Sequence, residues 1–384
     1  SIGLVGSEMC IRDRNRDSKR ARRIMYCGRR VGAVDSDSRS LPGSRPAVIR
    51  LCARIFTRHT GRPEIASSPL VVKAARSGRR TRNSTDPHMS NVYDLAVLRG
   101  DGIGAEVVNE ALKVLDTVEQ IYGFQTKRED LPYGAEHFLK TGETMPDAAF
   151  DRLRDMHAVL FGAVGDPRIE VGKLEFAIIA GLRHKLDLFV NLRPIKLYHE
   201  SLCPLKGKQP EHIDMMFCRE NTEDAYAGIH GATKRGSADE ISMQQMLYTR
   251  KGTERIIRYA FELAKQRGPN GGRSKPKVSL VDKANAVRAQ ELWTRTFREV
   301  AAEYPDIDTD HAYIDAACMY MVKDPERFDV GVTTNLFGDI ITDLGAELVG
   351  GIGIAASGNI HPGQVSMFEG IHGSAPDIAG KDVA

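Results

Sequence analysis

Residues 92–123 have the sequence VYDLAVLRGDGIGAEVVNEALKVLDTVEQIYG, and this stretch decides the fold class. Its apolar run at 95–98 is typical of a buried strand. The glycines of GDGIG, at 100–104, predict a tight turn because glycine adopts backbone conformations that other residues avoid. Over 107–118 the apolar residues recur at helical spacing. The stretch therefore predicts a strand, a turn and a helix in succession.

Strand and helix patterns alternate along the rest of the chain. Strands are expected in HAVLFGAVG (157–165) and IDMMFCREN (213–221), and a helix ended by Gly268-Pro269 in TRKGTERIIRYAFELAKQR (249–267). Further units of both kinds are expected in LEFAIIAGLRHKLDLFVNLRPIKLY (174–198), KVSLVDKANA (277–286), HAYIDAACMYMV (311–322) and FDVGVTTNLFGDIITDLGAELVGG (328–351). The alternation predicts an α/β fold with a largely parallel sheet. The spacing G-x-G-x-G differs from the Rossmann fingerprint, so a plain strand-to-helix turn is at least as good an interpretation of the glycines.

Length and composition limit the class of protein. The chain has 384 residues, 41% of them hydrophobic, which is enough for a sizeable core and two domains. No apolar run approaches the ~18–20 residues that span a bilayer, so we expect no membrane partner. Six cysteines are scattered without CxxC spacing. We therefore expect neither a disulfide framework nor a zinc site, and a reducing compartment, the cytoplasm.

The first 88 residues differ from the remainder in charge and pattern. They carry 20 Lys and Arg against 7 Asp and Glu, whereas residues 89–384 carry 34 against 44. The segment is rich in Arg, Ser, Gly and Pro and has no sustained periodicity, so we expect a disordered or non-native extension, with Met89 as a candidate start. Two alternatives stay open, an organellar transit peptide and a nucleic-acid-binding arm. Few aromatic residues and no recognisable motif disfavour the arm, and we predict no nucleic-acid partner.

Two carboxylates lie four residues apart in NLFGDIITD (335–343). On a helix Asp339 and Asp343 share one face, and their neighbours are apolar. No Lys or Arg lies between Arg327 and Lys381, so the compensating cation comes from elsewhere in the fold or from solvent. Oxygen ligands suit Mg²⁺ or Mn²⁺, and Asp315 at the end of an apolar strand is a candidate third ligand. A solvated helix face with counter-charges nearby is the alternative.

Basic side chains also lie at the ends of predicted elements. Arg183, Arg193 and Arg219 would together suit a substrate with two or three carboxylates, because guanidinium pairs with carboxylate through two parallel hydrogen bonds. Singly, each is better explained as a surface or salt-bridging residue. Lys283 ends a strand, where a lysine with a depressed pKa would serve as a general base. Tyr226 lies in a polar stretch bounded by glycine, for which a packing role is the default.

Several motifs together resemble the β-decarboxylating dehydrogenases, a family that includes the 3-isopropylmalate, isocitrate, homoisocitrate and tartrate/D-malate enzymes. The resemblance covers 93–384 and rests on these motifs in order: LRGDGIGAEV, DLFVNLRPIKLY, FCRENTEDAYAG, VDKANA, YIDAAC, NLFGDIITDLG and HGSAPDIAGKDVA. It implies an isopropylmalate dehydrogenase-like two-domain fold with a mixed, largely parallel sheet, which is not a Rossmann fold. The first domain would comprise 89–188 and 350–384, and the second 189–349.

The resemblance also implies roles for named residues. It makes Asp315, Asp339 and Asp343 the ligands of Mg²⁺ or Mn²⁺, with Asp315 donated across a homodimer interface and also facing the substrate. Tyr226 and Lys283 become the catalytic pair. The residues implied for binding the hydroxy-di- or tricarboxylate substrate are Glu175, Ile179, Arg183, Arg193, Arg219 and Asn285. Those implied for the adenosine-binding loop are His372, Gly373, Ser374, Ala375, Asp377 and Ile378.

Cofactor and substrate follow from the same resemblance. Asp377-Ile378 is similar to the NAD-type members, since an acid bonds a ribose 2′-hydroxyl and repels a 2′-phosphate. Apolar Phe176, Ile179 and Ala180 before Arg183 favour a hydrophobic substituent, so 3-isopropylmalate of leucine biosynthesis is the expected substrate. Tartrate/D-malate and isocitrate or homoisocitrate remain alternatives. Because the family continues beyond AGKDVA, an inactive, C-terminally truncated fragment is a further expectation of a different class.

Overall fold

The computed structural model describes residues 91–382, so the predictions for residues 1–88 lie outside the described residues. Its longer helices are α2 (Gly104–Tyr122), α3 (Ala135–Thr141), α4 (Asp147–Arg154), α5 (Gly181–Lys185), α6 (Arg250–Arg267), α7 (Glu291–Ala301), α8 (Ile314–Lys323) and α9 (Asn335–Glu347). Its strands are β1 (Asn91–Gly100), β2 (Phe124–Asp130), β3 (Ala158–Ala163), β4 (Val190–Lys196), β5 (Asp214–Glu220), β6 (His230–Thr233), β7 (Ile241–Gln244), β8 (Lys277–Asp282), β9 (Asp308–Tyr313), β10 (Val330–Thr333), β11 (Ala356–Ile360) and β12 (Ser366–Gly370).

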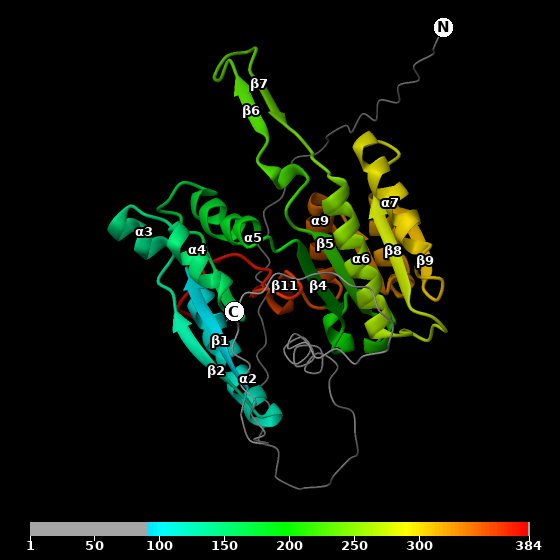
Figure 1. The fold of residues 1–384 in the computed structure, drawn as a ribbon, viewed down its shortest axis with the longest axis horizontal. Coiled ribbons are helices and arrows are strands. Elements are labelled where there is room, and N and C mark those ends of the chain that lie inside the picture. Colours follow the sequence, from blue (N-terminus) through cyan, green and yellow to red (C-terminus); the bar gives the residue numbers. More distant parts are fainter. Residues whose placement is uncertain (1–90, 383–384) are drawn as a thin grey trace, which may run out of the picture. The chain divides into compact units, whose positions relative to one another are not determined.

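Ten of these strands form one mixed sheet, in the order β2-β1-β3-β12-β11-β4-β5-β10-β8-β9 (Figure 1). Strand β11 is antiparallel to both of its neighbours, and β4 is antiparallel to β5. The pairs on either side of this region are parallel. The predicted α/β class with a mixed, largely parallel sheet is therefore confirmed. The strands of the predicted first domain lie in one run, β2 to β11, and those of the second from β4 to β9, but the division into domains stays a prediction.

The opening stretch folds as predicted, and its glycines have a packing role. Gly100 and Gly102 adopt φ of +69° and +56°, which glycine tolerates at little cost. A Cβ on Gly100 would lie 1.8 Å from the carbonyl oxygen of Ala163, and one on Gly102 would lie 1.9 Å from that of Ser374. The Ile103 N–H donates to the same Ser374 oxygen at 2.9 Å. The turn therefore holds the 370–378 loop against β1 and β3.

Helix α9 packs closely on β4 and β5 because it contains two glycines seven residues apart. A Cβ on Gly338 would lie 2.5 Å from Cγ of Arg219, and one on Gly345 would lie 2.2 Å from Cδ1 of Ile195. Residues seven apart share one helix face. This face brings Asp339, which lies next to Gly338, over the end of β5.

Replacing Gly338 with alanine is expected to destabilise the fold by ~1–3 kcal/mol, because the added methyl meets the inner part of the Arg219 side chain and α9 has to shift. Chemical denaturation measures the change in the free energy of unfolding. Gly353→Ala is the control, since nothing lies within 4 Å of its Cβ position. A Gly338→Ala protein as stable as the control would contradict the close packing of α9.

Two segments differ from their predictions in detail. The predicted helix start after β8 is instead a tight turn, in which the Lys283 carbonyl accepts from the N–H groups of Ala286 and Val287, and α7 begins only at Glu291. The expected helix before Arg183 opens with a π-helical turn, Glu175–Ala180. Such wider turns rotate side chains relative to an α-helix and are frequent at functional sites. Here Ile178 is fully buried, Ile179 is half-buried, and Phe176 is 68% exposed.

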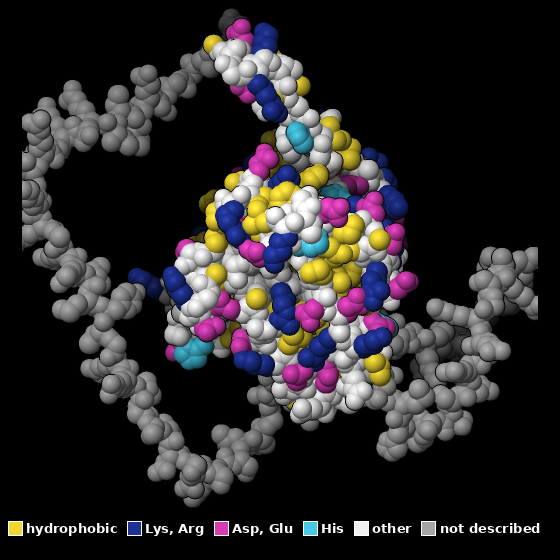
Figure 2. Space-filling view, turned by 90° about the vertical axis from the view of Figure 1, so that its left-hand side faces the viewer, with side chains coloured by type: hydrophobic (Ala, Val, Ile, Leu, Met, Phe, Trp, Pro, Cys, Tyr) yellow, Lys and Arg dark blue, Asp and Glu magenta, His cyan; other side chains and the backbone are white. Residues whose placement is uncertain are grey.

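The hairpin of β6 and β7 projects from the rest of the described chain in both views (Figures 1 and 2). All four residues of β7 are exposed, including Ile241 and Met243. On the face seen in Figure 2, basic and acidic side chains are interspersed around hydrophobic ones. None of the helices within residues 91–382 has the length and apolarity that crossing a bilayer requires.

Candidate active site

Strand register places a row of buried polar residues across the middle of the sheet. Asn359 of β11 pairs with Asn191 of β4, which pairs with Arg219 of β5, which pairs with Thr333 of β10. All four are at most 1% exposed. A buried polar group needs a hydrogen-bond partner, so such a row is costly unless its members satisfy one another or a ligand.

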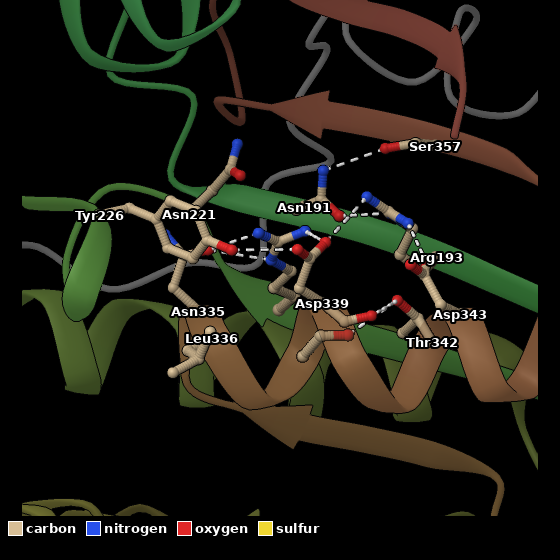
Figure 3. Close-up of polar contacts among 12 residues, drawn as sticks. Asn191, Arg193, Asn221, Tyr226, Asn335, Leu336, Asp339, Thr342, Asp343 and Ser357 are labelled. Carbon is tan, nitrogen blue, oxygen red and sulfur yellow. Dashed lines mark hydrogen bonds and ion pairs between the residues drawn. The ribbon is translucent and has the colours of Figure 1, made fainter. Parts of the chain in front are cut away.

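Arg219 links β5 to helix α9. Its Nε and Nη2 donate to Oδ1 of Asn335 at 2.9 and 2.7 Å, and its Nη1 donates to Oδ1 of Asp339. The hydroxyl of Tyr226 donates to the other oxygen of Asp339 at 3.0 Å (Figure 3). The Arg219 side chain is almost fully buried, and this burial lowers its pKa to about 10. The predicted counter-charge for the aspartate pair therefore comes from a strand that lies far away in the sequence.

Arg193 of β4 lies beside the second aspartate. Its Nε donates to Asn191 at 2.6 Å, and its Nη1 lies 3.6 Å from Oδ1 of Asp343. This buried Nη1 makes no hydrogen bond with any described residue. Burial lowers the pKa of Arg193, and burial together with the Asp339 charge raises that of Asp343. The site therefore holds one buried guanidinium nitrogen that forms an ion pair with Asp343 but makes no hydrogen bond to a described residue.

Arg183 completes the cluster of arginines. Its Nε donates to Oδ1 of Asn359 at 3.1 Å, and its Nη2 lies 3.2 Å from Glu369, which also accepts from Asn359. The charge of Arg183 contributes to lowering the pKa of both Arg193 and Arg219. The structure thus pairs Arg193 and Arg219 with Asp339 and Asp343, and it links Arg183 to Arg193 through Asn359 and Asn191.

Lys283 and Asp315 lie apart from this cluster. Nζ of Lys283 donates to Oδ1 of Asp315 at 2.5 Å, and this contact lowers the pKa of Asp315. Among residues 91–382, Asp315 does not join Asp339 and Asp343 in a group of three metal-ligating side chains. The Asp315 side chain is 66% exposed, and Asn285 in the same turn as Lys283 is also exposed. One chain therefore brings together two of the three predicted metal ligands.

The predicted cofactor loop follows β12. Ser374 is buried against the glycine turn, Ala375 adopts a left-handed φ of +38°, and Asp377 is exposed. Glu175 approaches the same place, because a Cβ on Gly165 would lie 2.8 Å from the Glu175 carboxylate and 3.2 Å from the Ser374 hydroxyl. The ring of His372 packs at Gly370, where a Cβ would lie 2.5 Å from its Nε2. Gly373 and Ile378 complete the loop.

Comparisons with known proteins match this chain to one family. Residues 94–384 match the isocitrate/isopropylmalate dehydrogenase family. The chain belongs to this family. It is 50% identical over 293 residues to the 3-isopropylmalate dehydrogenase of Thermobifida fusca, covering 76% of this chain and 81% of the relative. The enzyme of the same name from Streptomyces griseus is 48% identical over 300 residues, covering 77% and 84%.

Solved structures of the isocitrate/isopropylmalate dehydrogenase family have the same fold. Isocitrate dehydrogenase from Methylococcus capsulatus aligns with a TM-score of 0.66 at 38% identity, covering 75% of this chain and 80% of that one. The β-decarboxylating dehydrogenase from Thermococcus kodakarensis aligns with a TM-score of 0.59 at 34% identity, covering 75% and 78%. The predicted family, its fold and the dehydrogenase class are therefore confirmed.

Sequence reasoning missed several residues of this dehydrogenase site. Asn335 receives the Arg219 guanidinium, and its own amide donates to the Glu223 carbonyl at 3.2 Å. Asn191 and Asn359 bond each other and the arginines, and Glu369 faces Arg183. The available signal was a polar residue within an apolar strand or shortly after one. Such a residue indicates a buried polar position, but its partners depend on strand order.

Glu220 is a buried carboxylate directly after Arg219 in this dehydrogenase. It accepts hydrogen bonds from the N–H and hydroxyl of Thr222 and from the Glu223 N–H, yet burial raises its pKa to about 7. Between about pH 4.5 and 7 the folded state then holds a proton that the unfolded state has lost, so stability falls as pH rises through this range.

Replacing Glu220 with glutamine is expected to remove this decrease of stability with rising pH. The free energy of unfolding of the wild type should fall by ~1–3 kcal/mol between pH 5 and 7, because each unit of pKa shift corresponds to ~1.4 kcal/mol. The free energy of unfolding of the variant should change less with pH over the same range, whatever its absolute stability. Urea denaturation at a series of pH values measures both. Equal slopes in the two proteins would show that Glu220 does not carry the raised pKa.

Proposed function

We propose that this chain catalyses the NAD-dependent oxidative decarboxylation of 3-isopropylmalate, with Mg²⁺ or Mn²⁺, as a step of leucine biosynthesis. The observation that carries the proposal is the group of three arginines, in which Arg193 and Arg219 pair with Asp339 and Asp343 and the buried Nη1 of Arg193 makes no hydrogen bond to any described residue. Guanidinium groups pair with carboxylates through two parallel bonds. A substrate with two carboxylates would satisfy this cluster.

Asp339 and Asp343 fit a divalent cation by the chemistry of their donors. They present carboxylate oxygens, which Mg²⁺ and Mn²⁺ prefer, and their side chains are 36% and 56% exposed. We assign Asp315 of a second chain as the further ligand, since one chain does not bring it to the pair. A cation bound there would polarise the hydroxyl and carboxylate oxygens of the substrate. The arginines would bind and orient the remaining charges.

The protein's own groups would move the protons. Lys283, through a water molecule, would accept the proton of the C2 hydroxyl while the C2 hydride passes to the nicotinamide. The resulting ketone is β to the C3 carboxylate, so the bond from C3 to that carboxylate breaks, CO₂ leaves, and the electron pair forms an enolate. Tyr226 would then protonate C3. Burial, and next the Asp339 charge, raise the pKa of Tyr226, which keeps its proton in place until that step.

For the cofactor we propose NAD, bound beside the 370–378 loop. Asp377 is exposed there, and an acid at this position would bond a ribose 2′-hydroxyl and repel a 2′-phosphate. The glycine turn holds the loop through Ser374, and His372 and Ile378 lie in the same segment. Ala375 turns the chain with its left-handed φ.

For the substrate, the curated relatives and the surface before Arg183 favour 3-isopropylmalate. The relatives at about half identity are named 3-isopropylmalate dehydrogenases. Ile179 is half-buried and Phe176 is exposed, so both present apolar surface near Glu175. Apolar surface suits an isopropyl group and gives a third carboxylate no partner.

We also propose a homodimer with shared sites. One face of α8 contains Asp315, Met319 and Val322. Met319 is 71% exposed and Val322 is 45% exposed, and such exposed apolar side chains indicate a surface that another chain covers. Ile340 of α9 is 54% exposed. For the compartment we propose the cytoplasm, because Cys203, Cys218 and Cys318 are free thiols, as is usual in reducing compartments.

The test is a comparison of kcat/KM for 3-isopropylmalate, D-malate, tartrate and isocitrate, each with NAD or NADP and with Mg²⁺ or Mn²⁺. We expect 3-isopropylmalate with NAD to exceed every other combination by at least ~10-fold, since one substituent in an apolar pocket is worth ~1–3 kcal/mol. Preference for isocitrate would overturn the inference that Phe176 and Ile179 favour a substrate with a hydrophobic substituent. Turnover of none of the four acids would overturn the proposed function as a whole.

A further inference from the structure

Asp224 is a buried carboxylate held in a strained backbone conformation. It lies between β5 and Tyr226, is 1% exposed, and has φ +70° and ψ −145°. This region is disfavoured for any residue with a side chain and costs ~1–3 kcal/mol, so the surrounding structure has to compensate. Its carboxylate bonds two segments: Oδ2 accepts from the Leu336 N–H at 2.9 Å, and Oδ1 accepts from the Tyr248 hydroxyl at 2.8 Å.

The contact with Tyr248 continues into the turn that carries Lys283. The hydroxyl of Tyr248 accepts from Nε2 of Gln290 at 2.7 Å, and Oε1 of Gln290 accepts from the Lys283 N–H at 2.6 Å. Gln290 is fully buried. One unbroken chain of hydrogen bonds therefore runs from the backbone of Lys283 to the first turn of α9, the helix that contains Asp339.

The direction of every bond in this chain follows from the backbone N–H groups at its two ends and from the carboxylate of Asp224 within it. Both ends are backbone N–H groups, which only donate, so the chain needs one member that accepts from both sides. An ionised carboxylate does this, whereas an amide has one accepting and one donating end. An asparagine at position 224 would turn its amide N–H groups either toward the Leu336 N–H, as facing donors, or toward the Tyr248 hydroxyl, whose O–H would then lose its acceptor. In a buried chain such a conflict is costly.

We propose that Asp224 is a positioning residue that sets the distances between three segments of the active site: the Tyr226 turn, the start of α9, and the Lys283 turn. The Tyr226 turn is fixed because Asp224 opens it, and its carbonyl accepts from the Ala227 N–H at 3.3 Å. The other two segments are fixed through Leu336 and through Tyr248 with Gln290. The inference rests on the proposed function, in which these segments carry the proton donor, the cation ligands and the base.

A purely stabilising network and a positioning network predict different kinetics. If the chain only stabilised the fold, a variant would unfold more easily, but its folded molecules would have wild-type kcat. If it positions the segments, kcat falls in the folded protein, because small displacements of reacting groups cost up to ~10²-fold. The KM of the substrate should change little, since Arg193 and Arg183 are held by Asn191 and Asn359, which lie outside this chain of hydrogen bonds.

The experiment measures kcat, KM and thermal stability of Asp224→Asn and of the milder Tyr248→Phe. We expect kcat to fall ~10–100-fold in both, with KM within about threefold, and the double variant to lose little more than Asp224→Asn alone. Tyr304→Phe is the matched control, because its hydroxyl bonds exposed Glu262, which takes no part in this chain of hydrogen bonds. Wild-type kcat in a folded Tyr248→Phe protein would overturn the positioning role.

Amide hydrogen exchange tests the same chain without turnover. Exchange at the Lys283 and Leu336 amides, measured by NMR, should accelerate at least ~10-fold at both sites in Tyr248→Phe and at neither in Tyr304→Phe. Acceleration at one site alone would overturn the coupling. If the wild type turned over none of the hydroxy acids, the proposed function would fail, and the two exchange rates would still decide whether the chain couples the segments.

Discussion

Replacing Asp339 with asparagine is expected to lower kcat/KM by at least ~10³-fold, the largest effect of any change considered. The Asp339 carboxylate accepts from Nη1 of Arg219 and from the Tyr226 hydroxyl, and Nη2 of Arg193 lies 3.9 Å away. An asparagine has one oxygen, so one donor would face an amide N–H, and the buried Arg219 charge would lose its only nearby anion among its described hydrogen-bond partners. Steady-state kinetics at saturating Mg²⁺ or Mn²⁺ measures the loss.

The comparison with other acids of α9 makes this prediction specific. Asp343→Asn should cost less, because its side chain is 56% exposed and its nearest guanidinium lies 3.6 Å away. Glu347→Gln, an exposed acid one turn further on, is the control and should keep wild-type activity. If Asp339→Asn kept its metal-dependent turnover, then the aspartate pair would not be the cation site, and the proposed mechanism would fail.

The sequence was sufficient for those features of the site that depend on local spacing. Helical periodicity places Asp339 and Asp343 on one face, and the strand-turn-helix pattern at 92–123 appears where it was predicted. Both follow from neighbours in the sequence, whose geometry a helix or a strand fixes. The resemblance to known dehydrogenases supplied the roles that spacing alone left open.

Features that depend on strand order could not be predicted from spacing. Arg219 meets Asp339 only because β5 lies under α9, and Asn191 meets Asn359 only because β11 returns to pair with β4. These partners are 120 and 168 residues apart. The absence of Lys or Arg near the aspartates indicated a missing cation, and the fold supplies two guanidinium groups at that place. The π-helical turn at Glu175–Ala180 likewise has no signature in the apolar pattern.

Replacing Arg219 with lysine is expected to lower kcat/KM by ~10²–10³-fold and to destabilise the fold by ~2–4 kcal/mol, although the charge is conserved. Arg219 uses all three of its nitrogens, two for Asn335 and one for Asp339, and its guanidinium lies 5.5 Å from the centre of the Tyr226 ring. A lysine has one ammonium group, which reaches either Asn335 or Asp339. The residue that the ammonium group does not reach, either Asn335 or Asp339, would then lose its hydrogen-bond donor beside a buried charge.

A matched control separates this effect from the general cost of an arginine-to-lysine change. Arg258 also makes a two-bond contact, to Glu303 at 2.7 and 2.8 Å, but its side chain is 39% exposed on α6. Arg258→Lys should cost less than ~1 kcal/mol and leave kcat/KM unchanged, because solvent replaces the lost bonds of an exposed pair. Equal losses in the two variants would show that burial of Arg219 between β5 and α9 does not matter. A loss confined to Arg219→Lys would instead show that its planar shape, rather than its charge, holds Asp339 and Asn335 in place.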